Sequence, residues 1–310
     1  MAKEMAKVAL VLEAHRGPAL AVAFSPDEKT LYTGGDDKLV CAFEVGASGK
    51  GERIAKLTGH TAPVATLAYD TAGERLASGS QDEVRLWDSR TNKLAHEFKG
   101  ESLVAFGPAG HHLATIASLS IASKPAAPGD PVPGARVTLW DARELSVLRH
   151  IDPFDRRHTA LCFAPNGSLL FVGGSGRIHR IALPDGTSEG VQSGHQIAVS
   201  HIRPSPNEAV FGSTGMDGTL FFWTVVGGDE VNSISLATSP GPGGFPLSFG
   251  PDGRKVAVGC GNSVRIYTAP DGVLQMEIPA HAEVHDVAVS PSGRWVANAL
   301  ANGSVHVHEI

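Results

Sequence analysis

The sequence predicts an all-β fold, a seven-bladed β-propeller in which four-stranded sheets form a ring. Three observations lead to this prediction: a turn phrase that recurs seven times, short apolar runs that alternate with period two around it, and a high content of turn residues. The 310 residues include 36 Gly and 20 Pro, and 6% are aromatic. Glycine and proline mark tight turns, so this composition favours many short strands over long helices.

The turn phrase, seen as "FSPDEK" and "FGPDGR", begins at residues 24, 69, 106, 163, 204, 249 and 289. Successive copies are 45, 37, 57, 41, 45 and 40 residues apart. With one exception these spacings are close to the roughly 40–45 residues of a four-stranded propeller blade. We therefore expect a single domain over residues 1–310, with blades at about 14–56, 57–99, 100–152, 153–190, 191–237, 238–279 and 280–310.

Each copy carries four apolar runs, which predict four strands. In the second copy "PVATLAY" leads into the turn phrase, "RLASGS" follows it, and "EVRLWD" and "LAHEF" come next. Alternation of apolar and polar residues is typical of half-buried strands. Repeats of four strands without helical periodicity favour sheets that pack radially around an axis.

Two irregularities complete the predicted ring. The spacing of 57 residues contains an insertion, residues 118–135, rich in Pro, Ala, Gly and Ser, which predicts a loop between the second and third strands of blade three. The last repeat ends after its third strand, whereas the apolar run at 7–13 has no partner in the first repeat. We expect residues 7–13 to complete the last blade, because a closed ring leaves no sheet edge exposed.

Charge and cysteine content argue against several classes of protein. The formal net charge is −6 and no long basic cluster is present, so nucleic-acid binding is not expected. Cys41, Cys162 and Cys260 lie far apart and predict neither a disulfide framework nor a zinc site. The run Val8–Leu12 is too short for a signal peptide or a membrane span. We expect a cytoplasmic protein that has no cofactor and does not insert into a membrane.

The repeats resemble the WD-repeat family of β-propellers, whose signatures are Gly-His and Trp-Asp pairs at fixed places in each blade. The chain carries these signatures as "TGH" at 58–60, "LASGSQDEVRLWD" at 76–88, "VTLWD" at 137–141, "GH" at 194–195 and "DGTLFFW" at 217–223. The resemblance covers nearly the whole chain. It implies the propeller fold and a role in binding other proteins.

The resemblance also implies a hydrogen-bonded chain of His, Ser or Thr, Asp and Trp within a blade. Its members would be His60, Ser78, Asp82 and Trp87 in blade two, His195, Ser213, Asp217 and Trp223 in blade five, and His15, Thr33 and Asp37 in blade one, where Phe43 takes the Trp place. Hydrolase triads use the same residue types, but at one open site. Repetition at constant offsets favours a structural role, because a buried polar network is worthwhile only when every member is satisfied.

Four blades depart from this pattern, and we expect them to be locally weaker. Blade three has Trp140 without the His or the Asp, blade four has Ile181 in the Trp place, and blade six has Tyr267 there. In blade seven the Ser, Asp and Trp places hold Asn298, Asn302 and His308. His306 shares a strand face with His308, but no cysteine or carboxylate cluster completes a set of metal ligands, so no metal is expected.

The preferred function is a non-enzymatic scaffold that binds proteins or peptides with the loops of one face. The resemblance places there the starts of the inner strands and the turns between second and third strands, which hold Leu20, Asp36, Gln81, Arg157, Ser200, Met216, Phe245, Glu283 and His285. Apolar anchors rimmed by polar groups are typical of a protein-binding patch, and Leu20, Met216 and Phe245 are the expected anchors. The insertion 118–135 leaves from the same face and is a further candidate contact.

The alternative is a propeller enzyme or small-molecule binder that acts at the central channel. Such a site needs convergent titratable groups. The inner strands are mostly apolar or small, and their chemistry is carried by His201, Arg203, Glu283, His285 and Asp286.

Overall fold

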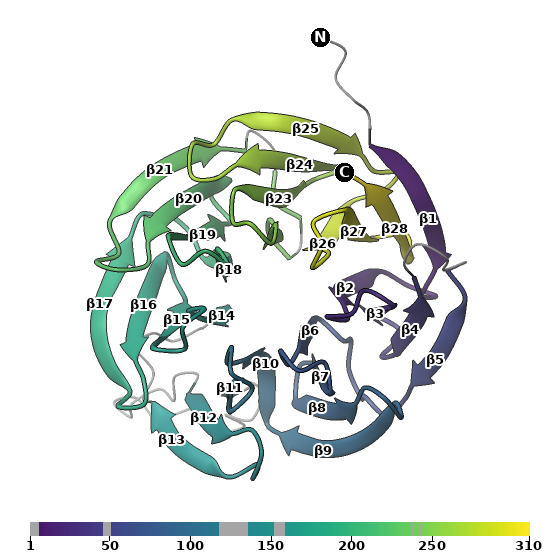
Figure 1. The fold of residues 1–310 in the computed structure, drawn as a ribbon, viewed down its shortest axis with the longest axis horizontal. Helices are drawn as coiled ribbons and strands as arrows, with labels where there is room; N and C mark the ends of the chain where they lie inside the picture. The colour runs from purple at the N-terminus through teal and green to yellow at the C-terminus, as the bar shows by residue number, and fades with distance from the viewer. Residues whose placement is uncertain (1–5, 46–50, 118–135, 152–158, 237–238, 242) are drawn as a thin grey trace, which may run out of the picture.

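The structure, a computed structural model, describes residues 6–45, 51–117, 136–151, 159–236, 239–241 and 243–310. Within these ranges 28 strands form seven antiparallel four-stranded sheets, and there is no helix. The sheets stand as blades around a central opening (Figure 1). The predicted all-β, seven-bladed propeller is confirmed.

Each blade begins with an inner strand beside the channel, followed outward by a second strand. The inner strands are β2 (Ala19–Phe24), β6 (Thr66–Tyr69), β10 (Glu101–Phe106), β14 (Ala160–Phe163), β18 (Val199–Pro204), β22 (Leu247–Phe249) and β26 (Val284–Val289). The second strands are β3 (Thr30–Gly35), β7 (Arg75–Gly79), β11 (His112–Ala117), β15 (Leu169–Gly173), β19 (Val210–Gly215), β23 (Lys255–Cys260) and β27 (Trp295–Leu300).

A third strand and an outer strand complete each blade. The third strands are β4 (Val40–Glu44), β8 (Glu83–Asp88), β12 (Val137–Asp141), β16 (Arg177–Ala182), β20 (Thr219–Thr224), β24 (Ser263–Thr268) and β28 (Ser304–Glu309). The outer strands are β5 (Arg53–Leu57), β9 (Lys93–Lys99), β13 (Val147–Ile151), β17 (Thr187–Ser193), β21 (Glu230–Ser235), β25 (Leu274–Pro279) and, for blade seven, β1 (Lys7–Glu13).

Apolar side chains from facing sheets pack into clusters between neighbouring blades. Between blades four and five, the ring centroids of Phe171 and Phe211 are 4.3 Å apart, and Trp223 stacks beside Phe211. Between blades seven and one, Val305 packs with Leu31. Burial of apolar surface is the dominant favourable term in folding, so the alternating strands hold the ring together mainly through contacts between blades.

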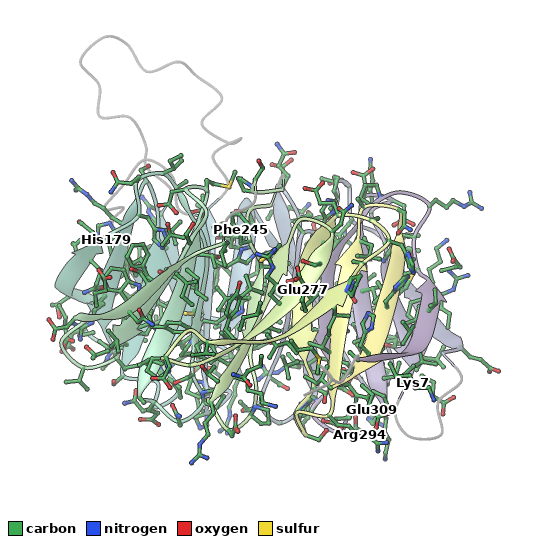
Figure 2. The ribbon with its side chains drawn as sticks, turned by 90° about the horizontal axis from the view of Figure 1, so that it is seen from above. Lys7, His179, Phe245, Glu277, Arg294 and Glu309 are labelled. Carbon is green, nitrogen blue, oxygen red and sulfur yellow. The ribbon has the colours of Figure 1, made fainter. Side chains whose placement is uncertain are left out.

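The ring is closed by the strand nearest the amino terminus, as predicted. β1 pairs antiparallel with β28, from Lys7 opposite Glu309 to Leu12 opposite Val305. The Leu12 side chain is buried in the cluster between blades seven and one. Figure 2 shows the disc edge-on, with Lys7, Arg294 and Glu309 close together, and an Arg294 Nη2–Glu309 Oε1 ion pair measures 2.9 Å. Blade seven therefore combines β1, the first strand in the sequence, with the last three strands, β26 to β28.

Several sequence predictions concern single features. The insertion at 118–135 and Arg157 lie outside the described residues, and the strands β11 and β12 that flank the insertion are neighbours in blade three. Cys41, Cys162 and Cys260 are buried and form no disulfide. Among the described residues, no helix has the length and apolar character needed to cross a membrane.

Candidate functional site

Four inner strands carry a bulge near the point where they start. The register of β2 shifts at Leu20, and equivalent shifts occur at Ser102 in β10, Ser200 in β18 and His285 in β26. A bulge leaves one residue outside the ladder and re-aims its side chain. Leu20, Ser200 and His285 all line a cavity in the central channel.

The turns between second and third strands lie beside these bulges. The backbone N–H of Asp36 donates to the carbonyl of Pro18 at 2.9 Å, and the N–H of Met216 donates to the carbonyl of Ala198 at 2.9 Å. Each turn is thus fixed next to the start of the inner strand in its own blade. We call this surface, made of those turns and strand starts, the loop face.

Most of the predicted contact residues lie on the loop face. Asp36 and Gln81 are exposed, and the half-buried ones are Leu20, Ser200, Met216, Glu283 and His285. The His285 Nε2 is 3.9 Å from the Glu283 Oε2, so these two side chains lie together at the mouth of the channel. Ile197, which the sequence reading did not single out, is 55% exposed on the same face, two residues before β18.

Phe245 is not an exposed anchor, and that prediction is wrong. Its side chain is 0% exposed and packs with Phe222 and Leu247 between blades five and six. The backbone turns at Gly244, whose φ of +84° favours glycine, and a Cβ at this position would collide with the Ser200 side chain. The segment therefore presents backbone to the cavity and buries the aromatic ring.

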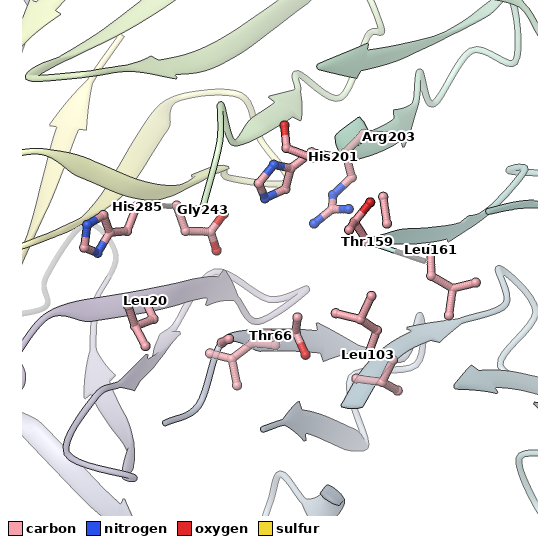
Figure 3. A pocket seen from close by; sticks show the side chains of 15 residues that line it. Leu20, Thr66, Leu103, Thr159, Leu161, His201, Arg203, Gly243 and His285 are labelled. Carbon is pink, nitrogen blue, oxygen red and sulfur yellow. The ribbon is translucent and has the colours of Figure 1, made fainter. Parts of the chain in front are cut away.

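A cavity of about 260 Å³ occupies the channel (Figure 3). Its wall is formed by inner strands of six blades, all but blade six, and by the segment at Gly243. The apolar part of the wall comes from Leu20, Leu67, Leu103, Val104 and Leu161. The polar part includes Thr159, Ser200, His201, Arg203, His285 and Asp286.

Among the described residues of this wall, Arg203 is the one with a permanent positive charge. Its Nη1 donates to the Ile202 carbonyl at 3.0 Å. Within the described part of the chain, no carboxylate lies within 4.0 Å of its guanidinium nitrogens. The guanidinium therefore has donors left for a group inside the cavity.

Burial shifts the pKa values of Asp286 and His201 away from their ordinary values. The Asp286 Oδ2 accepts the Val22 N–H and its Oδ1 accepts the Val287 N–H, both at 2.9 Å. Burial raises the pKa of Asp286 to about 6, against the opposing effect of these hydrogen bonds and of Arg203. Burial lowers the pKa of His201 to about 3, and the positive charge of Arg203 acts in the same direction. His201 is thus neutral near pH 7.

No group of His, Cys, Asp and Glu side chains among the described residues is arranged to hold a metal ion.

The histidine-centred chain of blade five lies inside the sheet. The His195 Nε2 is 2.8 Å from the Ser213 Oγ, its Nδ1 is 3.2 Å from the Asp217 carboxylate, and the Trp223 Nε1 donates to the Ser213 Oγ at 2.8 Å. Since Nδ1–H donates to the carboxylate, the serine hydroxyl donates to Nε2 and also accepts from the indole. Ser213 is fully buried, so the chain ties strands together and offers no open nucleophile. Blade one repeats the contacts with His15, Thr33 and Asp37.

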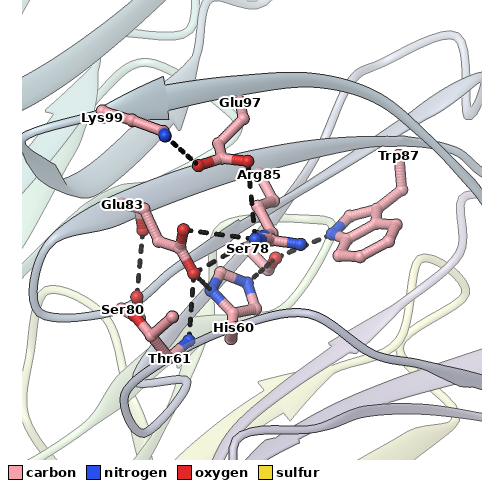
Figure 4. Close-up of polar contacts among 9 residues, drawn as sticks. All are labelled: His60, Thr61, Ser78, Ser80, Glu83, Arg85, Trp87, Glu97 and Lys99. Atoms are coloured by element: carbon pink, nitrogen blue, oxygen red, sulfur yellow. Dashed lines mark hydrogen bonds and ion pairs between the residues drawn. The ribbon is translucent and has the colours of Figure 1, made fainter.

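In blade two the carboxylate of the chain is Glu83, and the assignment of Asp82 is wrong (Figure 4). The His60 Nδ1 is 3.0 Å from the Glu83 Oε1 and its Nε2 is 2.6 Å from the Ser78 Oγ, which also accepts from the Trp87 Nε1 at 2.8 Å. Asp82 is exposed, whereas Glu83 is buried.

The length of one turn explains the exchange. In blade five Ser213 pairs with Phe221, whereas in blade two Ser78 pairs with Arg85, so the turn of blade two is one residue shorter. The shorter turn brings Glu83 to the first position of β8, from which the longer glutamate side chain reaches the histidine. The shorter turn is visible in the sequence and could have identified Glu83 as the carboxylate of the chain.

The Glu83 carboxylate is stabilised in its charged form. Burial acts to raise the pKa of Glu83, but Arg85, the Thr61 N–H and His60 outweigh burial and lower it. The Arg85 Nε is 3.2 Å from the Glu83 Oε1. Burial lowers the pKa of His60 to about 4, so a neutral histidine donates to an ionised glutamate.

Blade three uses a chain that sequence reasoning missed. The Trp140 Nε1 donates to the Thr115 Oγ1 at 2.8 Å, and the Thr138 Oγ1 donates to the Glu101 Oε1 at 3.4 Å. Burial raises the pKa of Glu101 to about 7, although hydrogen bonds from Thr115 and Thr138 oppose it. Blade three has no histidine at the usual place, and the buried Glu101 carboxyl at the start of β10 makes a polar contact in its stead.

Blade seven has no comparable chain among the described residues. His308 and Asn298 are buried, and their side-chain nitrogen and oxygen atoms have no hydrogen-bond partner in the described part of the molecule. The His306 ring lies 6.1 Å from the His308 ring and 5.6 Å from the His281 ring. Burial lowers the pKa of His308 to about 4, and both neighbouring histidines lower it further.

Acid is expected to destabilise blade seven through His308. Its pKa is about 6.5 in the unfolded chain and about 4 when folded, so stability is lost as the pH falls from about 6.5 towards 4. At pH 5 this loss is about 2 kcal/mol. The His308→Leu variant should therefore lose fewer degrees of melting temperature between pH 7.5 and pH 5 than the wild type. His111→Leu, at an exposed position, is the control, and equal losses in all three proteins would contradict the assignment.

Comparison with known proteins agrees with this architecture. The family model described as WD domain, G-beta repeat, matches residues 6–44, 51–88, 186–224 and 272–309. Each matched segment begins with the outer strand of one blade and continues through three strands of the next, as in β1 to β4. The repeat in the sequence is therefore offset by one strand from the blade. Because of this offset, the first strand of the first repeat, β1, is the outer strand of the last blade and closes the ring.

Similar proteins carry the same repeats. The chain is 27% identical over 215 residues to the serine-threonine kinase receptor-associated protein of Dictyostelium discoideum, and the alignment covers 67% of each chain. It is 27% identical over 237 residues to transducin beta-like protein 3 of Bos taurus, which covers 71% of this chain and 28% of that protein. It is 34% identical over 100 residues to pre-mRNA-processing factor 19 homolog 2 of Arabidopsis thaliana, which covers 32% of this chain and 18% of that protein. The matched repeats, the seven four-stranded blades and the closing strand show that the chain belongs to the WD-repeat β-propeller family.

Proposed function

We propose that the chain is a non-enzymatic scaffold that binds a partner protein across the loop face. The observation that carries this proposal is the set of bulges at the starts of the inner strands. They turn Leu20, Ser200 and His285 into the mouth of the cavity, next to the turns that expose Asp36 and Gln81. A rigid ring with an apolar hollow and a polar surround has the composition of a protein-binding surface.

Two further apolar side chains of this surface lie at blade five, beside the cavity. Ile197 is 55% exposed, and the half-buried Met216 follows Gly215 in the adjacent turn. Aliphatic and thioether side chains of this kind are suited to the centre of an interface. The name of the Dictyostelium relative, a receptor-associated protein, describes a protein that acts by association, which is consistent with the same role here.

Catalysis at the channel has less support. Both oxygens of Asp286 accept backbone hydrogen bonds, and His201, with a pKa of about 3, is a weak base near pH 7. The serines of blades two and five are fully buried within their hydrogen-bonded chains. A general base or a nucleophile must reach its substrate, so these groups fit a structural role better than a catalytic one.

The scaffold proposal predicts that a charge on the loop face abolishes partner capture. Ile197→Glu places a carboxylate at the proposed interface. Val226→Glu is its matched control, since Val226 is 85% exposed in the turn after β20, at the opposite end of the same blade. Tagged wild type and both variants would be expressed in the native host, and co-purifying proteins compared by quantitative mass spectrometry. We expect the amount of each specific partner captured by Ile197→Glu to fall at least tenfold, which is equivalent to about 1.4 kcal/mol of binding free energy. Val226→Glu should capture the wild-type amount.

The reverse pattern, with capture lost only in Val226→Glu, would place the interface on the other face. Both variants should keep the wild-type melting temperature within a few degrees, because exposed substitutions usually change stability by less than about 0.5 kcal/mol. Thermal melts therefore separate lost binding from lost folding.

A further inference from the structure

We propose that the central cavity receives the free C-terminal carboxylate of a partner chain, held by Arg203. This inference rests on the proposed function and specifies the chemistry of the partner. Within the described wall of the cavity, Arg203 faces the space with donors that have no carboxylate within ion-pair distance. A guanidinium presents five N–H donors in a fixed fork, and a carboxylate accepts two of them side by side.

Asp286 does not cancel this preference, although it lies in the same wall. Its two oxygens already accept the N–H groups of Val22 and Val287, and no ion pair joins it to Arg203. The carboxylate is therefore held by the backbone of blades seven and one, whereas the guanidinium makes one hydrogen bond within the described residues, to the neighbouring Ile202 carbonyl. The side chain that remains available for a ligand is the cation.

The position of Arg203 favours a chain end over an acidic side chain. Arg203 comes three residues after Ser200, which lies at the mouth of the channel, and a strand rises about 3.3 Å per residue. Because Nη1 bonds to the Ile202 carbonyl, the guanidinium stays near the level of residues 202 and 203, about 7–10 Å below the mouth. A glutamate side chain reaches only about 5 Å from its Cα. Arg203 is the last residue but one of β18, so the depth is counted from the loop face, where the proposed partner binds. A partner loop that crosses the mouth on this face cannot place a side-chain carboxylate at this depth, whereas a chain end that enters from this face can reach it.

The remainder of the wall suits the last residues of such a chain. Leu67, Leu103 and Leu161 provide apolar surface for small or aliphatic side chains. Ser200 and Thr159 lie near the mouth, and their hydroxyls donate to the Thr214 and Val199 carbonyls, so towards a peptide backbone their oxygens can act only as acceptors. A volume of about 260 Å³ is below the about 300–1,000 Å³ typical of pockets for drug-sized ligands, which fits a short chain end better than a folded element.

The test uses four small probes and the intact chain at pH 7. They are N-acetyl-leucyl-alanine with a free carboxylate, the same dipeptide as its amide, the α-amide of N-acetyl-glutamate, and the amide of N-acetyl-arginine. Binding is followed by NMR through the side-chain Nε–Hε resonance of Arg203, which is assigned by its loss in Arg203→Lys. We expect a saturable shift with the free dipeptide carboxylate and none with the other three probes.

Variants identify the residue responsible. Arg203→Gln should abolish binding of the dipeptide, followed in this variant through backbone resonances of β18. Arg203→Lys keeps the charge without the fork and should weaken binding about tenfold. Arg177→Gln is the matched control, because Arg177 is an exposed arginine on β16 outside the cavity. If Arg203→Gln fails to fold, the lysine variant still decides the outcome.

Three results would overturn the proposal. They are equal binding of the amide, binding of the glutamate or arginine probe in place of the dipeptide, and no saturable shift up to about 10 mM, which corresponds to about −2.7 kcal/mol. Failure here is distinguishable from failure of the scaffold proposal. If Ile197→Glu loses its partners while the dipeptide carboxylate does not bind, the loop face is the interface and the cavity does not hold a chain end.

Discussion

Deletion of residues 1–13 is expected to destabilise the whole ring, because it removes β1 from blade seven. The truncation leaves β28 as a six-residue open sheet edge and removes Leu12 from the cluster between blades seven and one. Domains are stable by only about 5–15 kcal/mol, and loss of a paired strand together with a buried leucine removes several kcal/mol of that. We expect a melting temperature lowered by 10 °C or more, at about 2–4 °C per kcal/mol, together with aggregation through the exposed edge.

Thermal melts and size-exclusion chromatography measure both effects. The matched control is deletion of residues 1–5, which leaves β1 intact at Lys7–Glu13. If the 1–13 truncation melts like this control and stays monodisperse, β1 does not close the ring in solution.

Glu83→Ala is expected to have the largest effect of any single substitution in the hydrogen-bonded chains. It removes the acceptor for the His60 Nδ1 and the Thr61 N–H, and it leaves Arg85 without its nearest carboxylate. Removing one partner of a buried ion pair costs about 3–5 kcal/mol, whereas an exposed ion pair is worth about 0–1 kcal/mol. We therefore expect Glu83→Ala to lower the free energy of unfolding by about 3 kcal/mol, measured by denaturant titration.

The adjacent carboxylate provides the comparison. Asp82 is exposed, so Asp82→Ala should cost no more than about 1 kcal/mol. Equal losses in the two variants, or a larger loss in Asp82→Ala, would contradict the assignment of Glu83. An Arg85→Ala variant should fall between them, because His60 keeps its acceptor.

Much of the fold was predictable because each repeat carries the same local information. Alternating runs specify strands, and turn residues separate them, so seven copies near a common spacing imply seven blades. The closing strand was also predictable, since one strand was missing at the end of the sequence and an apolar run was unpaired at its start. Blade closure follows from counting strands and needs no knowledge of side-chain contacts.

The errors arose where one residue changes the geometry. Asp82 has the expected residue type at the expected offset from Ser78, but a turn shorter by one residue transfers the role to Glu83. Phe245 follows two glycines in a segment that reads as a loop, yet the turn at Gly244 directs its ring into the core. Motif offsets predict which kind of residue is present, whereas the local turn length and backbone conformation decide where its side chain points.

The cavity was the least predictable part. Its polar wall combines Arg203 from blade five with Asp286 from blade seven, and the two side chains are brought together only when the ring closes. Sequence reasoning identified both as polar residues on inner strands. Their distances, the hydrogen bonds that occupy Asp286 and the depth of Arg203 below the mouth depend on how seven blades pack around the axis.

The central claim is that the loop face is the surface that binds a partner, and site-specific photo-cross-linking in the native host tests it most directly. A photoreactive amino acid would replace Asp36, Gln81 or Ile197 on the loop face, and Asn92, Val226 or Asp271 in turns at the opposite end of the blades. We predict that the three loop-face positions cross-link the same partner protein and that the three opposite positions do not. Cross-links to a common partner from the opposite positions alone would contradict the claim.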